Sequence, residues 1–257
     1  MDDLDFTDSE LERYSRHILL PEVGAIGQAK LRAASVLIIG AGGLGAPMIM
    51  YLAAAGIGRI GIIDDDLVDL SNLQRQVAHT TDRIGVNKAE SAAATAKAIN
   101  PEITVDILPF RLASDTIDDL FSQYDVIADG TDNFETRYLV NDAAVRQSKT
   151  LVTAALLRFD GQITTVKPGG PCYRCLFPNP PPPAAVPSCS EAGVLGSVAG
   201  ILGTMQATEI IKEIMDVGDS LSGRLMLFDG LSMSLRAMKA KQRKDCPACS
   251  IAHPETG

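Results

Sequence analysis

The sequence predicts an α/β fold built on a doubly wound, mostly parallel sheet, with an antiparallel C-terminal extension and a structural zinc site. Three observations lead to this prediction. An apolar strand runs into a glycine-rich turn, strand-like and helix-like segments alternate over the first 155 residues, and two Cys-x-x-Cys motifs lie in the last third of the chain. Alternation of this kind is typical of parallel sheets that carry helices on both faces.

The glycine-rich turn follows the first apolar strand. Residues 36–39 are all apolar, which is typical of a strand covered on both faces. Next come three glycines at G-x-G-x-x-G spacing, namely Gly40, Gly42 and Gly45. A helical pattern over 46–55 follows at once, so backbone N–H groups and the helix dipole would together attract a phosphate. Asp64 ends a second apolar strand where a ribose-binding carboxylate is expected. This Rossmann-like unit predicts a bound nucleotide, and a purely structural tight turn is the alternative.

The remaining segments follow the same alternation and then depart from it. Strands are expected at 60–63, 103–108, 125–129 and 150–155, and helices at 11–20, 87–99, 116–121 and 133–147. After Gly161 the pattern changes to an antiparallel-looking strand at 162–167, a glycine-rich helix at 190–215 and a strand at 224–228. We expect a single domain over 1–257, with an N-terminal helical arm (1–30), a nucleotide-binding part (31–160) and a third part (161–257).

Composition and charge exclude several classes of protein. The 257 residues include 46% hydrophobic residues, enough for a full core. The net charge of −9 argues against nucleic acid or an anionic membrane as a partner. The start of the sequence lacks the basic segment and following apolar run of a signal peptide. The apolar stretch at 194–205 is too short to span a bilayer. A cytoplasmic enzyme is expected.

Charged residues cluster at the expected carboxyl ends of the strands, where doubly wound sheets bind ligands. Acidic groups follow two of these strands, and two cations lie between them, as follows: Asp64, Asp65, Asp66, Asp69, Asp129 and Asp132, with Arg75 and Lys88. A nucleoside triphosphate needs such cations and a carboxylate-bound metal, whereas a hydride-transfer cofactor does not. Ordinary surface charge is the alternative for any one of these residues.

The cysteines form two knuckles about seventy residues apart, Cys172-x-x-Cys175 and Cys246-x-x-Cys249. In a cytosolic chain this arrangement is typical of a closed zinc site with four thiolates, and a thioredoxin-type redox motif is the alternative. Such a zinc would tie the C-terminal segment to the main body. The fifth cysteine, Cys189, precedes an expected helix, where a thiolate is favoured; it is either reactive or a half-buried capping thiol.

Several segments resemble the MoeB/ThiF/HesA family and occur in the same order as in that family. Its members are the bacterial E1-like enzymes that activate ubiquitin-like sulfur carriers. These segments are 13–20, 36–45, 64–66, 71–76, 131–133, 172–176 and 191–194. The resemblance implies that ATP is bound by Gly43, Asp64, Ser71, Asn72, Leu73, Gln74, Arg75, Lys88, Asp132 and Asn133. We add Gly40, Gly42 and Asp66 to this ATP site. The resemblance also implies that Asp132 binds magnesium and that Arg16 reaches into the neighbouring subunit's site of a homodimer.

The implied reaction is adenylation of a sulfur carrier's C-terminal glycine, in a Gly-Gly end, giving an acyl-adenylate and pyrophosphate. A carboxylate is already a nucleophile at neutral pH, so no general base is needed, and Arg16, Arg75, Lys88 and magnesium would offset the charge of the leaving group. In some relatives a cysteine at the position of Cys189 binds the carrier covalently, and in others it is dispensable. Residues 161–257 would bind the carrier, two carriers would complete a heterotetramer, and a separate protein would donate sulfur.

The branch of the family and the class of protein both leave alternatives. Residues 160–164 and 191–194 resemble the molybdopterin branch, whereas 13–16 and 227–230 resemble the thiamine branch. We favour the molybdopterin synthase small subunit as the carrier, with the thiamine-pathway or another carrier as the alternative. Outside this class, an NAD-dependent oxidoreductase would rest on the glycine motif alone, and a non-catalytic scaffold would leave Arg75, Lys88 and Asp132 without a role.

Overall fold

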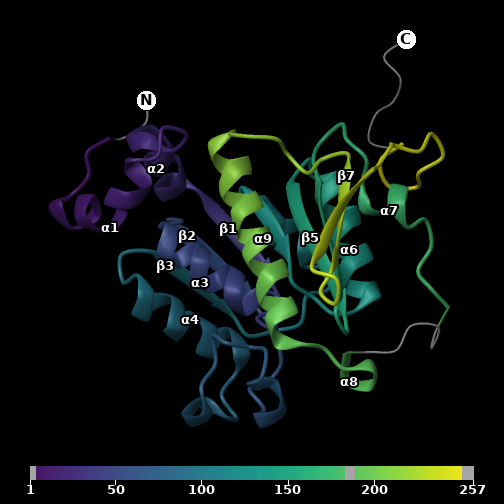
Figure 1. Cartoon of the computed structure of the whole chain (residues 1–257), viewed down its shortest axis with the longest axis horizontal. Coiled ribbons are helices and arrows are strands. Elements are labelled where there is room, and N and C mark those ends of the chain that lie inside the picture. The colour runs from purple at the N-terminus through teal and green to yellow at the C-terminus, as the bar shows by residue number, and fades with distance from the viewer. Residues whose placement is uncertain (1–3, 183–188, 251–257) are drawn as a thin grey trace.

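A computed structural model describes residues 4–182 and 189–250, without the side chains of Cys189 and Ser190. Within these residues it contains one eight-stranded sheet in the order β3-β2-β1-β4-β5-β6-β7-β8 (Figure 1). The strands are β1 (Ser35–Ile39), β2 (Arg59–Ile63), β3 (Thr104–Leu108), β4 (Val126–Asp129), β5 (Thr150–Leu157), β6 (Asp160–Val166), β7 (Arg224–Asp229) and β8 (Ser234–Lys239). The first five strands in this order run parallel to one another. The pairs β5–β6, β6–β7 and β7–β8 are antiparallel.

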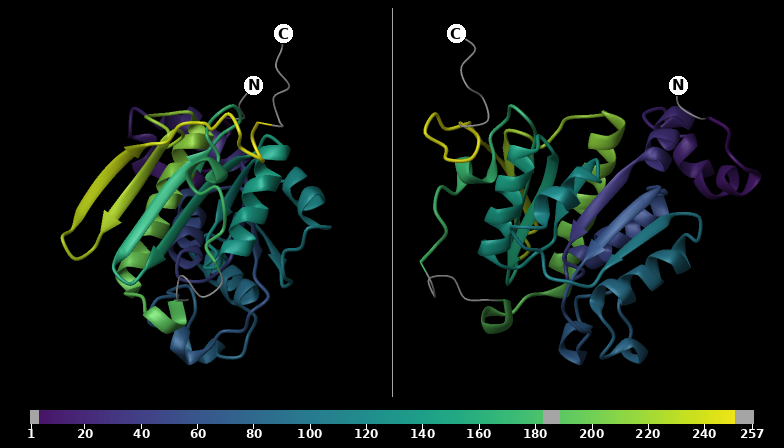
Figure 2. Two further views of the ribbon diagram at one scale, coloured as in Figure 1. Left: turned by 90° about the vertical axis from the view of Figure 1, so that its right-hand side faces the viewer. Right: turned by 180° about the vertical axis from the view of Figure 1, so that it is seen from behind.

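Helices cover both faces of the sheet, as the sequence predicts. They are α1 (Asp8–Ile18), α2 (Gly24–Ala33), α3 (Gly45–Ala55), α4 (Lys88–Ile99), α5 (Ile117–Ser122), α6 (Phe134–Arg146), α7 (Tyr173–Leu176), α8 (Cys189–Ala192) and α9 (Gly196–Met215). Helices α3, α4 and α9 pack on one face, in front of the sheet in Figure 1, and bury one apolar core there. Helices α5 and α6 bury a second core on the opposite face, which Figure 2 shows from behind.

The parallel strands end in register at one edge of the sheet. Ile39 at the end of β1 pairs with Ile63 and with Asp129, and Asp129 pairs in turn with Thr153. The loops that follow β1, β2 and β4 therefore leave the sheet side by side. This alignment positions the site described below, because residues distant in sequence meet at that edge.

The glycine-rich turn packs backbone to backbone against the loop after β4. Gly40 has a φ of +91°, and a Cβ there would lie 3.1 Å from the carbonyl oxygen of Gly130. A Cβ on Gly45 would overlap the carbonyl oxygen of Gly40, and one on Gly130 would lie 3.1 Å from the amide nitrogen of Gly45. Gly45 is therefore required by the close packing within the turn itself, and glycine at Gly40 and Gly130 lets the two segments lie in close contact.

Helix α1 begins with a capping box, in which Thr7 and Glu10 satisfy each other's backbone N–H groups. Its buried Tyr14 accepts a hydrogen bond of 2.8 Å from the side-chain amide of Asn100, and the same amide nitrogen donates to the carbonyl oxygen of Ala53 at 2.9 Å. The N-terminal arm is thus held on the ends of α3 and α4, at the opposite end of the molecule from the C-terminal segment (Figure 1).

Three features differ from the predicted elements. The expected helix at 190–215 is interrupted between α8 and α9, where Gly193 adopts a φ of +81° and Val194 bridges to Arg158. The structure adds the helices α2 and α7 and the strand β8, which the sequence pattern does not predict. β8 is an edge strand whose side chains are almost all exposed. Because neither face of the strand is buried, its sequence shows no alternation of apolar and polar residues. No helix in the two described ranges is long and apolar enough to cross a membrane.

The close approach at Gly45 makes a testable prediction. Replacing Gly45 with Ala should lower the free energy of unfolding by about 2–3 kcal/mol, because the new methyl group overlaps backbone that cannot yield without moving β1 or α3. Gly200 in α9 is the matched control. A Cβ there meets open space, so Gly200→Ala should leave stability unchanged or raise it by about 0.5–1 kcal/mol. Equal urea midpoints for the two variants would contradict the argument.

Candidate functional site

A cavity of about 290 Å³ lies at the carboxyl edge of the parallel strands. It brings together residues from the turn after β1, the loops after β2 and β4, and the start of α4. The predicted site residues that line it are Gly40, Gly42, Gly43, Asp64, Asp66, Arg75, Lys88, Asp132 and Asn133. Residues up to 93 positions apart in the chain, from Gly40 to Asn133, therefore form one site.

Asp64 holds the glycine turn and the loop after β2 together. One carboxylate oxygen accepts a hydrogen bond of 2.8 Å from the N–H of Ala41, and the other accepts one of 2.9 Å from the N–H of Asp66. Burial raises the pKa of Asp64, and these two N–H groups act in the opposite direction. Each oxygen retains a lone pair, so the carboxylate can accept a further hydrogen bond from a hydroxyl group in the cavity.

Two predicted cations face the cavity from different elements. Lys88 is the first residue of α4, is only 7% exposed, and forms an ion pair of 2.7 Å with the exposed Asp66. Asn87 caps this helix by accepting hydrogen bonds from the N–H groups of Ala89 and Glu90. Arg75 donates to the carbonyl oxygen of Ser71 at 3.2 Å, so its guanidinium is held along the cavity wall.

The other predicted residues of this segment, Ser71, Asn72, Leu73 and Gln74, are not among the described residues that line the cavity. They form the short 3-10 helix η1 (Leu70–Asn72) and the turn after it, which Asp69 caps through Ser71. The carbonyl oxygen of Asn72 accepts hydrogen bonds from the N–H groups of Arg75 and Gln76. In this structure the segment therefore places Arg75 and Gln76 in the wall.

Asp132 and Asn133 lie in the loop between β4 and α6. Asn133 caps α6, because its side-chain oxygen accepts a hydrogen bond of 2.9 Å from the N–H of Thr136. Asp132 is exposed in the cavity, and no donor from the described residues reaches its carboxylate. Among the predicted acidic residues that line the cavity, Asp65 and Asp132 thus have no partner in the described chain, whereas Asp64 and Asp66 already have partners.

The structure adds wall residues that the sequence analysis does not identify, namely Gln76, Phe110, Arg111, Leu112, Thr131, Thr136, Leu156, Val194 and Ala199. Position after a strand could have indicated some of them, because Phe110 to Leu112 follow β3 at the same edge. Gln76 is buried, and its side-chain oxygen has no partner in the described part of the chain. Val194 and Ala199 come from the antiparallel part. Val194 ends the segment 191–194 that carries the family resemblance, and no local pattern marks Ala199.

A second cavity of about 370 Å³ adjoins the first, since Asp132 and Leu156 line both. Its walls come from β5, β6, β7, β8 and the start of α6. They combine apolar side chains, namely Ala155, Leu157, Leu227 and Phe228, with the charged side chains of Arg137, Asp160, Asp229 and Arg236. Together the two cavities extend from the glycine turn to the antiparallel strands. A molecule in one cavity could therefore contact a molecule in the other beside Asp132.

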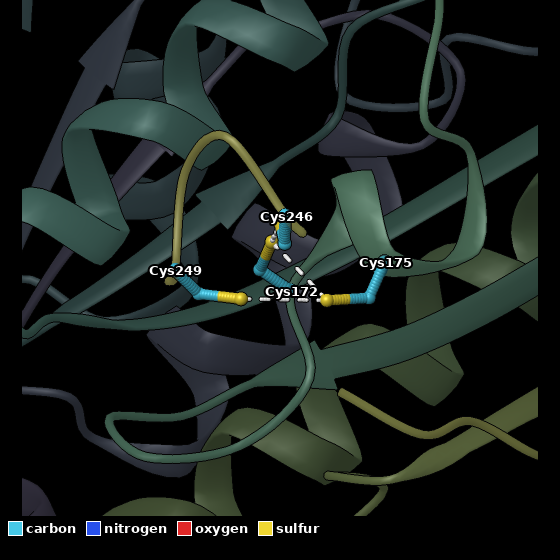
Figure 3. A group of neighbouring side chains, drawn as sticks. All are labelled: Cys172, Cys175, Cys246 and Cys249. Carbon is cyan, nitrogen blue, oxygen red and sulfur yellow. Dashed lines mark hydrogen bonds between the residues drawn. The ribbon is translucent and has the colours of Figure 1, made fainter. Parts of the chain in front are cut away.

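The four knuckle cysteines converge on one another (Figure 3). All are buried, with Sγ–Sγ distances of 3.9 Å for Cys172–Cys175, 3.5 Å for Cys172–Cys246 and 3.4 Å for Cys175–Cys249. Four thiolates around a tetrahedral zinc, at Zn–S distances of about 2.3 Å, lie about 3.8 Å apart, so the cluster fits this metal. Burial raises the pKa of Cys172, and raises that of Cys249 to about 11. A divalent cation would oppose this by stabilising the thiolates. None of the four lines either cavity.

Two predicted residues lie apart from the cavity. Arg16 is exposed on α1 and does not line either space in the described chain. Cys189 begins α8, and its side chain lies outside the part that the structure describes. Both histidines of the described residues also have structural partners: His17 donates to Gln28, and the buried His79 bonds Ser91 and the carbonyl of Ala41.

The fold is that of known enzymes. One crystal structure of Escherichia coli MccB matches with a TM-score of 0.80, at 23% identity over 96% of this chain and 76% of that one. A second, of MccB with ATP, matches with a TM-score of 0.77, at 24% identity over 93% of this chain and 74% of that one. At this identity the likeness concerns the fold alone.

The sequence itself is closer to other proteins. It is 47% identical over 250 residues to the sulfur carrier protein adenylyltransferase of Thermus thermophilus (95% of this chain, 92% of that one). It is 46% identical over 241 residues to the SAMP-activating enzyme E1 of Haloferax volcanii (94% and 89%). Adenylyltransferase and sulfurtransferase MOCS3 of Mus musculus is 50% identical over 242 residues, although the chain spans only 53% of its length. The ThiF family model matches residues 14–248, so the predicted resemblance is confirmed and this chain belongs to the ThiF family.

Proposed function

We propose that this protein transfers AMP from ATP to the C-terminal glycine of a ubiquitin-like sulfur carrier protein. One observation carries the proposal. A glycine turn at a helix start, a carboxylate, two cations and a free aspartate line one cavity, which opens beside Asp132 into a second space. The names of two relatives that match over about nine-tenths of their length, a sulfur carrier adenylyltransferase and a SAMP-activating enzyme, support the same reaction.

ATP would occupy the first cavity. Asp64 would accept hydrogen bonds from ribose hydroxyls, and the turn at Gly42 and Gly43 would hold phosphate oxygens with the help of the dipole of α3. Arg75 and Lys88 would attract the triphosphate.

The charges of the cavity support a magnesium ion that enters with ATP. Its lining includes four carboxylates and three cations, namely Asp64, Asp65, Asp66 and Asp132 against Arg75, Lys88 and Arg111. The difference is one negative charge, which would repel a triphosphate. A divalent cation would offset this repulsion. The carboxylates of Asp65 and Asp132 have no partner among the described residues, and the family resemblance favours Asp132 as the ligand.

The second cavity would receive the carrier's C-terminal tail. Its apolar walls between β5 and β7 suit an extended peptide, and its junction with the first cavity would bring a terminal carboxylate to the α-phosphate. An oxygen of this carboxylate forms a bond to the α-phosphorus while the bond to the β-phosphate bridge breaks, and pyrophosphate leaves. No proton has to be removed, in keeping with two described histidines that line neither cavity. Catalysis then rests on positioning and on charge stabilisation by Arg75, Lys88 and the metal.

The remaining assignments follow from the family resemblance. We propose a homodimer in which the exposed Arg16 reaches the neighbouring subunit's site, with two carriers completing a heterotetramer. The exposed apolar residues Leu19 and Leu20 beside Arg16 support a covered surface on this arm. The molybdopterin carrier remains our choice, a separate protein would supply sulfur, and Cys189 would act in the later transfer. Four reduced thiols suit a cytoplasmic setting.

An NAD-dependent oxidoreductase is less well supported. Hydride transfer would need the glycine turn and Asp64 but would leave Arg75, Lys88 and the free Asp132 in the wall without a role. A non-catalytic scaffold that binds a nucleotide or a carrier would leave Arg75, Lys88 and Asp132 without a catalytic role.

ATP–pyrophosphate exchange tests the proposal directly. The purified protein should catalyse exchange that depends on one member of a panel of carriers ending in Gly-Gly, and the responding carrier identifies the pathway. Binding of ATP without exchange for any carrier would favour the scaffold, and binding of NAD in place of ATP would favour the oxidoreductase.

Replacing Asp132 with Ala should reduce exchange on the order of 100-fold or more, because the metal loses its protein ligand. The melting temperature should be unchanged, since this side chain is exposed and has no partner among the described residues. Glu135 is an exposed acidic residue three positions after Asp132, so Glu135→Gln controls for the loss of one negative charge. Normal exchange in the Asp132 variant would show that the magnesium assignment is wrong.

Removing zinc with a chelator should lower the melting temperature by about 5–10 °C, because the tether between the two knuckles is lost. Once the chelator is removed and magnesium is restored, ATP affinity at low temperature should stay within about twofold, since no cluster residue lines the cavity in the described chain. The double variant Cys246→Ser/Cys249→Ser should behave in the same way. Loss of exchange at an unchanged melting temperature would instead make the metal catalytic.

A further inference from the structure

A buried ion pair lies directly beneath the loop that carries Asp132. Asp129, the last residue of β4, is fully buried, and Arg137 in the second turn of α6 is 4% exposed. Arg137 Nε lies 3.4 Å from Asp129 Oδ2. The pair therefore joins the strand before this loop to the helix after it.

Both members of the pair also hold the peptide at Thr131, one residue before Asp132. Asp129 Oδ1 accepts hydrogen bonds from the N–H of Thr131 at 3.0 Å and from its hydroxyl at 2.6 Å. Arg137 Nη2 donates to the carbonyl oxygen of Thr131 at 2.8 Å. With Thr131 held on both sides and Asn133 fixed as the cap of α6, the backbone on either side of Asp132 has little freedom.

The pair is fixed in turn by β5. Thr153 donates its hydroxyl to Asp129 Oδ2 at 2.7 Å, and Arg137 Nη2 lies 3.4 Å from the carbonyl oxygen of Ala154. The next residue but one, Leu156, lines both cavities, and Arg137 itself lines the second. The ion pair thus lies where the nucleotide and acceptor spaces meet.

Stability alone is a weak reason for a charge pair at this place. Removing two charges from water costs several kcal/mol per ion, and apolar residues of similar volume often stabilise a core equally well. Apolar side chains, however, could not donate to the carbonyl of Thr131 or accept from its N–H. What only this pair supplies is the set of directed hydrogen bonds to the loop.

We propose that Asp129 and Arg137 are positioning residues that hold Asp132 in the orientation in which it binds the metal of a metal–nucleotide complex. The inference rests on the proposed function and adds residues to it. It states that the metal-dependent part of nucleotide affinity depends on the hydrogen bonds beneath the loop, while the metal-independent part does not.

Two threonines that face each other across β5 and β6 allow a matched test. Thr153 and Thr164 are register partners, both are buried, and each hydroxyl makes one hydrogen bond. Thr153 donates to Asp129, whereas Thr164 donates to the carbonyl oxygen of Arg224, away from the loop. Thr153→Val and Thr164→Val therefore remove similar groups with similar effects on packing, and Thr153→Ser keeps the hydroxyl.

Calorimetric titration of ATP into each full-length variant, in magnesium and in EDTA, separates the possibilities without requiring a carrier. In magnesium, Thr153→Val should bind ATP about three- to tenfold more weakly than Thr164→Val, and Thr153→Ser should restore most of the affinity. In EDTA, the two valine variants should bind ATP equally.

Two results would overturn the inference, and they differ from each other. Equal affinities of the two valine variants in magnesium would make the ion pair structural only, while leaving the proposed function intact. If the wild-type protein bound no ATP in either buffer, the proposed function would fail and the positioning role with it.

Discussion

The whole site depends on a contact between two backbone segments that leaves no room for side chains. A Cβ on Gly40 or Gly130 would meet main-chain atoms of the other segment, and a Cβ on Gly45 would overlap the carbonyl oxygen of Gly40 within the turn. Because of this contact, the N–H groups of the turn, the start of α3 and the loop with Asp132 face one space. Asp64 then locks the arrangement through the N–H groups of Ala41 and Asp66. The cavity follows from main-chain packing, and the charged side chains are added to its walls.

The charges around this cavity fall into two groups with different surroundings. Lys88 and Asp66 form an ion pair whose aspartate is exposed, so water screens it and its partners can exchange when an anion arrives. Asp129 and Arg137 are buried and surrounded by directed hydrogen bonds. Breaking this pair would leave an unpaired charge away from water, so an exchange of partners costs far more free energy than it does at Asp66. The first arrangement suits the binding of a charged ligand, and the second suits a fixed scaffold beneath it.

Sequence reasoning identified the parts of the fold that local patterns specify. The glycine spacing, Asp64 and Lys88 were found because each follows a strand or begins a helix in the parallel half, and the structure brings them together in one cavity. Gln76 and Val194 lie in segments that carry the family resemblance, but their place in the cavity wall was not predicted, because it depends on how distant segments pack. The break before α9 was missed as well, since a glycine-rich stretch is compatible with both a helix and a turn. The pairing of Asp129 with Arg137 has no signature beyond two common charged residues. The two knuckles were recognisable from spacing alone, and the structure confirms that their thiols converge.

The thiol cluster also has a consequence for the order in which the protein forms on the ribosome. Cys172 and Cys246 are separated by 74 residues, a stretch that includes α9 and the hairpin of β7 and β8. The first knuckle therefore emerges from the exit tunnel well before the second, with only two of the four thiols. During this interval, the parallel strands before residue 160 can pair with one another, but the core on one face stays incomplete until α9 is made, because α9 packs on α3 and β5. The cluster can therefore close only after α9 and the hairpin of β7 and β8 have been synthesised.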